Sequence, residues 1–192
     1  MFLFIRHAEK VLSEPVHLSI LGYKRSMLLP DYIEHSQDLF KCPTAIFAMA
    51  NHRHGSHRCV ETVYWIATSL QLPIQTYKNW KTMLKKAHRE KCALICWEHK
   101  EIPKMLQYLG FHNVRSWGLY PKDEKDMKYC FDATWVMDNN KLIIYRQFSI
   151  NDYGEAIWIY PRIVPTSILY KTRSEPFYCR LISFCFPYII RI

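Results

Sequence analysis

Arg6 and His7 follow directly after an apolar run, and together they offer a phosphate ligand and a nucleophile. Arginine binds phosphate oxygens through a planar, permanently charged fork, and a neutral imidazole can attack phosphorus at physiological pH. The apolar run, residues 1–5, is too short for a secretory signal or a membrane span and is typical of a buried strand in a parallel sheet. Ligands bind at the carboxyl ends of such strands. The order strand, Arg-His, loop therefore predicts phosphoryl chemistry at this sheet edge.

A second arginine follows a second predicted strand. Residues 44–49 are apolar and predict a strand, and the polar loop after them leads into a helical pattern over residues 56–70. Ser56 is placed to cap this helix, which puts Arg58 in its first turn. Because the backbone N–H groups at a helix start attract anions, we expect this turn to contribute to a phosphate site.

A second histidine follows a third predicted strand. Residues 92–97 are apolar, and His99 comes just after them, ahead of a helix that we expect over residues 101–109. The carboxyl ends of parallel strands meet at one edge of a doubly wound sheet. We therefore expect one pocket that collects two guanidinium groups and two imidazoles, from Arg6, His7, Arg58 and His99.

Three blocks of the sequence resemble the histidine phosphatase superfamily, the group that contains phosphoglycerate mutases and many small phosphatases. In the first block, residues 4–10 (FIRHAEK) are similar to its Arg-His-Gly or Arg-His-Ala opening, and residues 18–25 (LSILGYKR) to its Leu-Thr-x-x-Gly helix start. Residues 56–62 (SHRCVET) are similar to its Ser-x-Arg-x-x-x-Thr stretch, and residues 94–103 (LICWEHKEIP) to the strand that delivers the second histidine. The blocks occur in order at compatible spacings, and the resemblance extends from residue 1 to about residue 155.

The resemblance implies a phosphoglycerate mutase-like fold and a covalent two-step mechanism. His7 would be the nucleophile that becomes phosphohistidine, and water would then hydrolyse the intermediate. Arg6, Arg58 and His99 would bind the phosphoryl oxygens of the substrate and stabilise the transition state. No metal or organic cofactor is expected, because the cationic side chains would do the electrostatic work that Mg²⁺ does in other phosphoryl-transfer enzymes.

The proton donor for the leaving group is where the sequence departs from this family. The mutase-like branch has a glutamate some tens of residues after the second arginine, but the matching interval here holds only Glu90, in a basic run. The acid-phosphatase branch has an acidic residue directly after the second histidine, where this chain has Lys100. A donor is needed because an alkoxide leaves poorly without a proton. The candidates are Glu98 and Glu101, with Glu9 and Glu61 as alternatives, and Glu9 is also expected to bind substrate.

The alternation of strand and helix patterns predicts an α/β fold, a three-layer α/β/α sandwich with a mostly parallel mixed sheet. The last two predicted strands are separated by a short turn and indicate a hairpin, which gives the sheet an antiparallel member. The expected elements are strands at residues 2–6, 44–49, 92–97, 133–138 and 141–148, and helices at residues 19–36, 56–70 and 101–109.

The 192 residues suffice for one core and are few for two, and no linker or repeat divides the chain. We expect one catalytic domain over residues 1–155 and a C-terminal extension over residues 156–192. The extension is expected to dock on this domain or to mediate self-association as a homodimer. Its apolar end is interrupted by Arg180 and Pro187 and is too short to span a bilayer, so we expect no transmembrane segment.

The formal net charge is +9, which would attract anionic ligands in general. Nucleic acid is not expected as a partner, because the sequence has no recognition motif of a nucleic-acid-binding module. The seven cysteines form no Cys-x-x-Cys pair and are expected to be reduced thiols of a cytoplasmic protein. His52, His54 and His57 share one loop without a thiol or carboxylate, so we interpret them as solvated or specificity residues rather than as metal ligands.

The leading hypothesis is a phosphomonoesterase, a hydrolase that acts on a small-molecule or protein-borne phosphate ester through a phosphohistidine. Two alternatives stay open. One is a phosphoglycerate mutase-type phosphoryl transfer, which is disfavoured because the chain is short and lacks the acid at the mutase-like position. The other is a non-catalytic phospholigand-binding or scaffold protein that retains the pocket without an effective acid.

Overall fold

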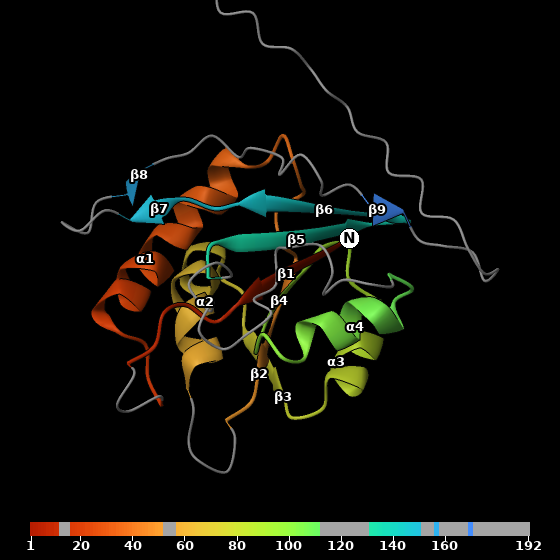
Figure 1. The fold of residues 1–192 in the computed structure, drawn as a ribbon, viewed down its shortest axis with the longest axis horizontal. Coiled ribbons are helices and arrows are strands. Elements are labelled where there is room, and N and C mark those ends of the chain that lie inside the picture. Colours follow the sequence, from red (N-terminus) through yellow and green to blue (C-terminus); the bar gives the residue numbers. More distant parts are fainter. Residues whose placement is uncertain (12–15, 52–56, 112–130, 151–155, 158–168, 171–192) are drawn as a thin grey trace, which may run out of the picture.

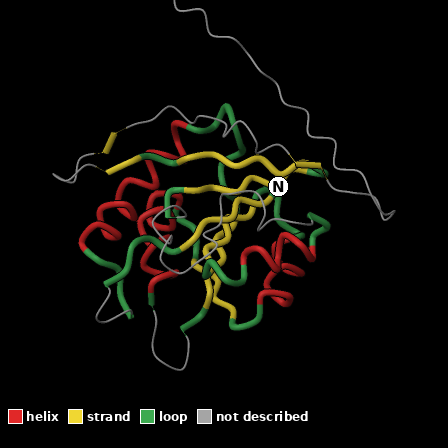
Figure 2. The backbone as a smooth tube through the Cα atoms, viewed as in Figure 1, coloured by secondary structure: helices red, strands yellow, loops and turns green. Residues whose placement is uncertain are grey.

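The structure, a computed structural model, describes residues 1–11, 16–51, 57–111, 131–150, 156–157 and 169–170. Within these residues, a mixed β-sheet lies between two layers of helices (Figure 1). Figure 2 shows the same arrangement, with the helices in red on either side of the yellow strands. The prediction of an α/β fold with a mixed sheet is therefore confirmed.

The main sheet consists, in chain order, of β1 (Phe2–Arg6), β2 (Ala45–Met49), β3 (Ile74–Tyr77), β4 (Ala93–Trp97), β5 (Ala133–Asp138), β6 (Lys141–Arg146) and β9 (Leu169–Tyr170). Their order in space is β3-β2-β4-β1-β5-β6-β9. The strands β3, β2, β4 and β1 pair in parallel, whereas β5, β6 and β9 pair antiparallel with their neighbours. The sheet thus has a parallel core, and β5 and β6 form the predicted hairpin.

The helices of the described residues are α1 (Ile20–His35), α2 (Arg58–Leu70), α3 (Trp80–Ala87) and α4 (Ile102–Tyr108). α1 and α2 pack against each other on one face of the sheet, and α3 and α4 cover the other face (Figure 1). Trp80 of α3 and Tyr108 of α4 form an edge-to-face pair with ring centroids 5.4 Å apart. Because both faces of the central strands are covered, these strands are continuous apolar runs in the sequence.

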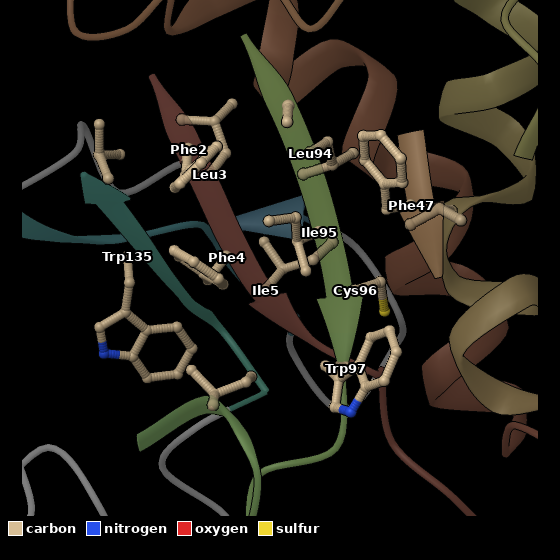
Figure 3. Packing of buried hydrophobic residues seen from close by; sticks show 14 of the residues in the cluster. Phe2, Leu3, Phe4, Ile5, Phe47, Leu94, Ile95, Cys96, Trp97 and Trp135 are labelled. Atoms are coloured by element: carbon tan, nitrogen blue, oxygen red, sulfur yellow. The ribbon is translucent and has the colours of Figure 1, made fainter. Parts of the chain in front are cut away.

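Strand β1 lies at the centre of the core, between β4 and β5 (Figure 3). Its apolar residues 2–5 are at most 3% exposed, and burying side chains of this size stabilises the fold by about 1.5–3 kcal/mol each. The parallel register with β4 places Arg6 opposite Trp97. Packing on both sides therefore determines where the chain leaves the sheet after β1.

The segment after β1 is held against the start of α1. The Ser19 hydroxyl caps α1 by accepting a hydrogen bond from the Gly22 N–H at 3.2 Å. The Ser19 N–H donates to the Glu9 carbonyl at 2.9 Å. Gly22 permits this approach, because a Cβ at that position would lie 2.1 Å from the Glu9 carbonyl oxygen. The Leu-Ser-x-x-Gly motif therefore serves capping and close packing of the backbone.

The predicted helices agree with α1, α2 and α4 to within two residues at each end. At α2, the predicted cap Ser56 lies outside the described residues. The N-cap position is His57, one residue later than predicted, and its side chain makes no capping hydrogen bond. Arg58 is nevertheless the first residue of the helix, as the sequence indicates.

The elements β3 and α3 were not predicted from the sequence. β3 is a short edge strand whose residues are only partly buried, so it lacks the apolar run that marks the other strands. α3 begins after Asn79, whose side-chain oxygen accepts hydrogen bonds from two backbone N–H groups of the first turn. Its buried residues are Met83, Leu84 and Ala87, and exposed lysines lie between and beside them. The apolar face is therefore only about one and a half turns long, which is too short to give a clear helical periodicity in the sequence.

The C-terminal part of the chain contributes two short pairings to the described structure. β7 (Ser149–Ile150) pairs with β8 (Ala156–Ile157), and β9 pairs with the edge strand β6. The expected domain boundary at residue 155 and most of the expected extension lie outside the described residues. None of the helices in the described part is long and apolar enough to cross a bilayer.

A Gly22→Ala substitution tests the close approach of α1 to Glu9. Replacing glycine by alanine within a helix normally stabilises it by about 1 kcal/mol. Here the added Cβ would meet the Glu9 carbonyl, so we expect the free energy of unfolding to fall by about 1–3 kcal/mol in urea denaturation. Ser69→Ala, at an exposed position of α2, is the control and should change it by less than about 0.5 kcal/mol. A stabilised Gly22→Ala variant would contradict this packing.

Candidate active site

A pocket of about 210 Å³ lies beyond the carboxyl ends of β1 and β4. These strands are adjacent and parallel, so the residues that follow them emerge at the same edge of the sheet. The first residue of α2 reaches the same place. The pocket is lined by Arg6, His7, Lys10, Arg58, Glu98, His99 and Lys100. The four side chains that were expected to converge therefore share one pocket.

His7 is held in one orientation by its own loop and by the neighbouring strand. It is 2% exposed, and its backbone N–H donates to the Trp97 carbonyl at 3.3 Å. The Nδ1 atom lies 2.7 Å from the Ala8 carbonyl oxygen. Because a carbonyl oxygen can only accept, Nδ1 carries the hydrogen, and in the neutral ring Nε2 then has the free lone pair. A histidine needs this tautomer to act as a nucleophile through Nε2.

The surroundings of His7 keep its ring neutral. The pKa of His7 lies well below its usual 6.5, above all because burial removes the water that would stabilise the imidazolium. The positive charges of Arg6 and Arg58 lower this pKa further, and His99 adds a smaller effect in the same direction. The hydrogen bond to Ala8 opposes them by favouring the protonated ring. At neutral pH, His7 is therefore in the form that can attack phosphorus.

Thr62 connects the loop of His7 to the helix of Arg58. Its hydroxyl accepts a hydrogen bond from the Ala8 N–H at 2.9 Å and donates to the Arg58 carbonyl at 2.7 Å. Thr62 is 1% exposed, so this link is shielded from water. The threonine of the Ser-x-Arg-x-x-x-Thr motif thus positions the backbone on both sides of the pocket.

Phe131 covers the buried arginine of the site. The centre of the Arg6 guanidinium lies 4.0 Å from the centroid of the Phe131 ring, and the His7 ring lies 5.8 Å from it. A cation above an aromatic ring is stabilised by the ring quadrupole. Phe131 precedes β5, far from Arg6 in the sequence, so its role depends on the pairing of β5 with β1 and was not predicted.

Glu98 is the candidate acid that lines the pocket. It follows Trp97 at the end of β4 and is half-buried. Glu101 does not line the pocket, and its carboxylate lies 2.5 Å from the Lys104 ammonium. The turn that begins α4 separates the two carboxylates, which sequence spacing alone left equivalent.

Glu9 lies outside the pocket lining. Its carboxylate forms a bidentate ion pair with Arg25, with Nη2 2.6 Å from Oε1 and Nε 2.9 Å from Oε2. Arg25 also donates to the Phe148 carbonyl at 3.1 Å. This geometry makes Glu9 a link between the β1 loop, α1 and the residues after β6. Its expected roles as substrate ligand and alternative acid stay predictions that this pairing does not favour.

Glu61, the other alternative acid, belongs to a polar cluster beside the start of α2. It accepts a hydrogen bond from the Leu18 N–H at 2.9 Å and lies 2.5 Å from the His17 Nδ1. The His17 ring stacks on His57 at a centroid distance of 5.3 Å, and the Asn51 amide lies 2.9 Å from the His57 Nδ1. These contacts connect His57, directly before Arg58, to the segment that precedes α1. Glu61 does not line the pocket, and its role as an alternative acid stays a prediction.

Lys10 and Lys100 are pocket residues that were not selected from the sequence. Lys10 is half-buried, and Lys100 is exposed. Lys10 follows His7 by three residues and Lys100 directly follows His99, and that proximity was the available signal. Lysine is common on surfaces, so the sequence did not distinguish these two from the other lysines of a basic chain.

Two sequence interpretations concern metals and thiols. Among the residues that the structure describes, no group of three or more histidine, cysteine, aspartate or glutamate side chains is placed to hold a metal ion. His52 and His54 lie outside the described residues. The cysteines within them have free thiols: Cys42, Cys59, Cys92 and Cys96.

The comparisons with known proteins give a similarity of structure. No protein-family model matches the sequence, and no curated protein matches it. The chain is similar to the solved structure of a phosphoglycerate mutase from Plasmodium falciparum, with 9% sequence identity and a TM-score of 0.42. The alignment covers 92% of this chain and 97% of that chain. We draw no functional conclusion from a similarity of this size.

The titration of His7 tests the electrostatics of the pocket. The His7 pKa should lie below 6.5 in the native protein, and Arg58→Met should raise it, because removing a nearby positive charge favours the imidazolium. The measurement is a pH titration of the His7 ring signals by NMR. Lys104→Met removes the same charge outside the pocket and should leave the titration of His7 nearly unchanged. A native His7 that titrates at or above 6.5 would refute the assignment.

Proposed function

We propose that this protein is a phosphatase that hydrolyses a phosphomonoester through a phosphohistidine intermediate on His7. The observation that carries the proposal is the hydrogen bond from Nδ1 to the Ala8 carbonyl, which leaves Nε2 as a nucleophile in a pocket that two arginines line. A neutral imidazole beside two guanidinium groups is suited to attack on an anionic phosphoryl group. The resemblance of the sequence around Arg6, Arg58 and His99 to the histidine phosphatase superfamily supports the same function.

In the first step, Arg6, Arg58 and His99 bind the phosphoryl oxygens. Nε2 of His7 attacks phosphorus, an N–P bond forms, and the P–O bond to the alcohol breaks. The two guanidinium groups offset the charge that spreads over the equatorial oxygens in the transition state. The ring gains positive charge as Nε2 is phosphorylated, and the Ala8 carbonyl stabilises it by accepting the hydrogen bond from Nδ1.

We assign the proton donor to Glu98. The leaving alkoxide takes the Glu98 proton as the P–O bond breaks, so the alcohol departs neutral. Glu98 is favoured because it lines the pocket, whereas Glu101 is paired with Lys104 and Glu9 with Arg25. Glu98 also directly precedes His99, so its carboxyl group lies at the same strand end as a residue that binds the phosphoryl oxygens.

In the second step, water attacks the phosphohistidine. Glu98, now a carboxylate, accepts a proton from this water, the N–P bond breaks, and inorganic phosphate leaves. The neutral His7 and the protonated Glu98 are then restored. An alcohol in place of water would give phosphoryl transfer, the mutase-type alternative, with the same residues, so the two activities differ only in the acceptor.

The phosphoenzyme is the first functional prediction. Wild-type protein incubated with a ³²P-labelled phosphomonoester and quenched in alkali should carry acid-labile, alkali-stable label, because phosphohistidine has this stability. His7→Ala should carry none, since it lacks the attacking nitrogen. His88→Ala is the matched control, because this exposed histidine at the end of α3 lies outside the pocket lining.

Label that persists in His7→Ala would rule out His7 as the nucleophile. Label that forms on His7 and passes to an added alcohol instead of water would replace hydrolysis by transfer as the activity. Wild-type protein that takes up no label and turns over no ester would support the phospholigand-binding alternative.

The role of Glu98 is tested by the leaving group. Glu98→Gln should slow the hydrolysis of alkyl phosphates by about 10²–10⁴-fold and that of p-nitrophenyl phosphate far less, because a nitrophenolate hardly needs a proton. Steady-state kcat/KM values on both esters provide the measurement. Glu101→Gln is the control, since that carboxylate lies outside the pocket lining, and it should slow both esters to the same small extent. A leaving-group effect in Glu101→Gln instead would move the assignment to Glu101.

A further inference from the structure

Positive charge is concentrated in one short part of the chain. Residues 78–91 contain six basic residues and one acidic residue, in a chain whose formal net charge is +9. The basic residues are Lys78, Lys81, Lys85, Lys86, Arg89 and Lys91, and all six are exposed. None of the ion pairs among the described residues involves any of them. Charge that is distributed this unevenly is typical of a surface that meets an anionic partner.

The packing of α3 leaves its lysines on the outside of the fold. Its apolar residues Met83, Leu84 and Ala87 are buried, because this side of the helix packs on β2 and β3. Lys81 and Lys85 are four residues apart and both exposed, so they lie next to each other on the outer side. The core already uses the apolar side of α3, and its lysine side is accessible to a partner.

An aromatic pair lies beside these lysines, where α3 and α4 meet. Trp80 is half-buried and packs edge-to-face on Tyr108, which is 59% exposed. The Lys81 ammonium lies 5.5 Å from the centroid of the Trp80 ring and 5.9 Å from that of the Tyr108 ring. Lys104, one turn before Tyr108 on α4, is exposed and pairs with Glu101. Cationic and aromatic side chains therefore share one surface over the two helices, which lie side by side in Figure 1.

We propose that this basic–aromatic surface, formed by Trp80, Lys81, Lys85, Lys104 and Tyr108, binds the surface of a membrane that contains anionic lipids. Lysine side chains are attracted to anionic headgroups, and tryptophan and tyrosine rings are enriched at the level of these headgroups. The lysines supply the attraction, and the exposed Tyr108 ring enters the headgroup layer. None of the five residues lines the pocket, so the proposal does not depend on the phosphatase function.

Single-stranded nucleic acid is the competing partner for a surface of this composition. Its bases bind by stacking on open faces of aromatic rings. Here the Trp80 ring is half-buried, and the Lys81 ammonium lies over both rings of the pair. A base would have to displace this lysine, whereas a headgroup layer contacts the ammonium and the Tyr108 ring together. The contacts therefore favour a lipid surface.

Sedimentation with sucrose-loaded vesicles tests the proposal. The full chain is mixed with vesicles of phosphatidylcholine, or of phosphatidylcholine and phosphatidylserine, at physiological ionic strength. We expect the chain to bind the anionic vesicles at least about tenfold more tightly than the neutral ones, since several lysines contribute. This preference should decrease as salt is added, because salt screens exposed charges.

Lys81→Gln and Lys85→Gln should each weaken binding to the anionic vesicles about fivefold, the usual contribution of one lysine near an anionic membrane. Lys24→Gln is the control, because it removes the same charge on α1, which covers the other face of the sheet. It should change this binding by less than about twofold. Tyr108→Ser should weaken binding several-fold, and Tyr64→Ser, at a similarly exposed tyrosine on α2, should not.

Equal binding to neutral and anionic vesicles overturns the proposal, and so does a failure to bind either. An equal loss in Lys24→Gln also overturns it, because general attraction of anions by a basic protein depends on the number of charges and not on their position. Oligouridine and polyglutamate are titrated in parallel. Tighter binding of either polymer than of the anionic vesicles, with the same loss in Lys81→Gln, would assign the surface to a nucleic acid or to an acidic protein instead.

Discussion

The parallel pairing of β1 with β4 is the constraint on which the rest of the site depends. It sets Arg6 opposite Trp97 and lets the His7 N–H donate to the Trp97 carbonyl at 3.3 Å, so the chain turns away from the sheet at one defined residue on each strand. A slip by one residue would turn every side chain of β1 to the other face of the sheet. The buried apolar residues 2–5 prevent this slip, because both faces of the strand are packed. Hydrophobic packing in the core is therefore what positions the charged groups at the edge.

Burial has opposite effects on the two residues that follow this core. For Arg6, which is 1% exposed, loss of water is unfavourable because the guanidinium stays charged. The Phe131 ring 4.0 Å away offsets part of this cost, by about 0.5–2 kcal/mol, and an anionic ligand would offset more. For His7, the same burial and the same neighbouring charge keep the ring neutral. The same burial thus leaves Arg6 charged and His7 neutral within one pocket.

Several residues of the family-like motifs act on the backbone rather than on a ligand. Ser19 caps α1, and Gly22 lets the Glu9 carbonyl approach it. Thr62 joins Ala8 to the Arg58 carbonyl. Together these contacts hold the segment that carries His7 between α1 and α2. Positioning of this kind would matter for the proposed phosphoryl transfer, which depends mainly on geometry and charge.

The sequence by itself determined the α/β class, the parallel core and the pocket of Arg6, His7, Arg58 and His99, because apolar runs and the residues just after them are local signals. It missed β3 and α3, where partial burial and exposed lysines obscure the periodicity. It also left the acid open between Glu98 and Glu101, with Glu9 and Glu61 as alternatives. The tertiary structure separates Glu9 from the others, because its carboxylate pairs with Arg25 of α1. That pairing depends on how α1 packs against the loop after β1, and no local spacing encodes it. The pair of Glu101 with Lys104 is local, three residues apart at the start of α4, and its spacing was a signal that the sequence analysis did not use.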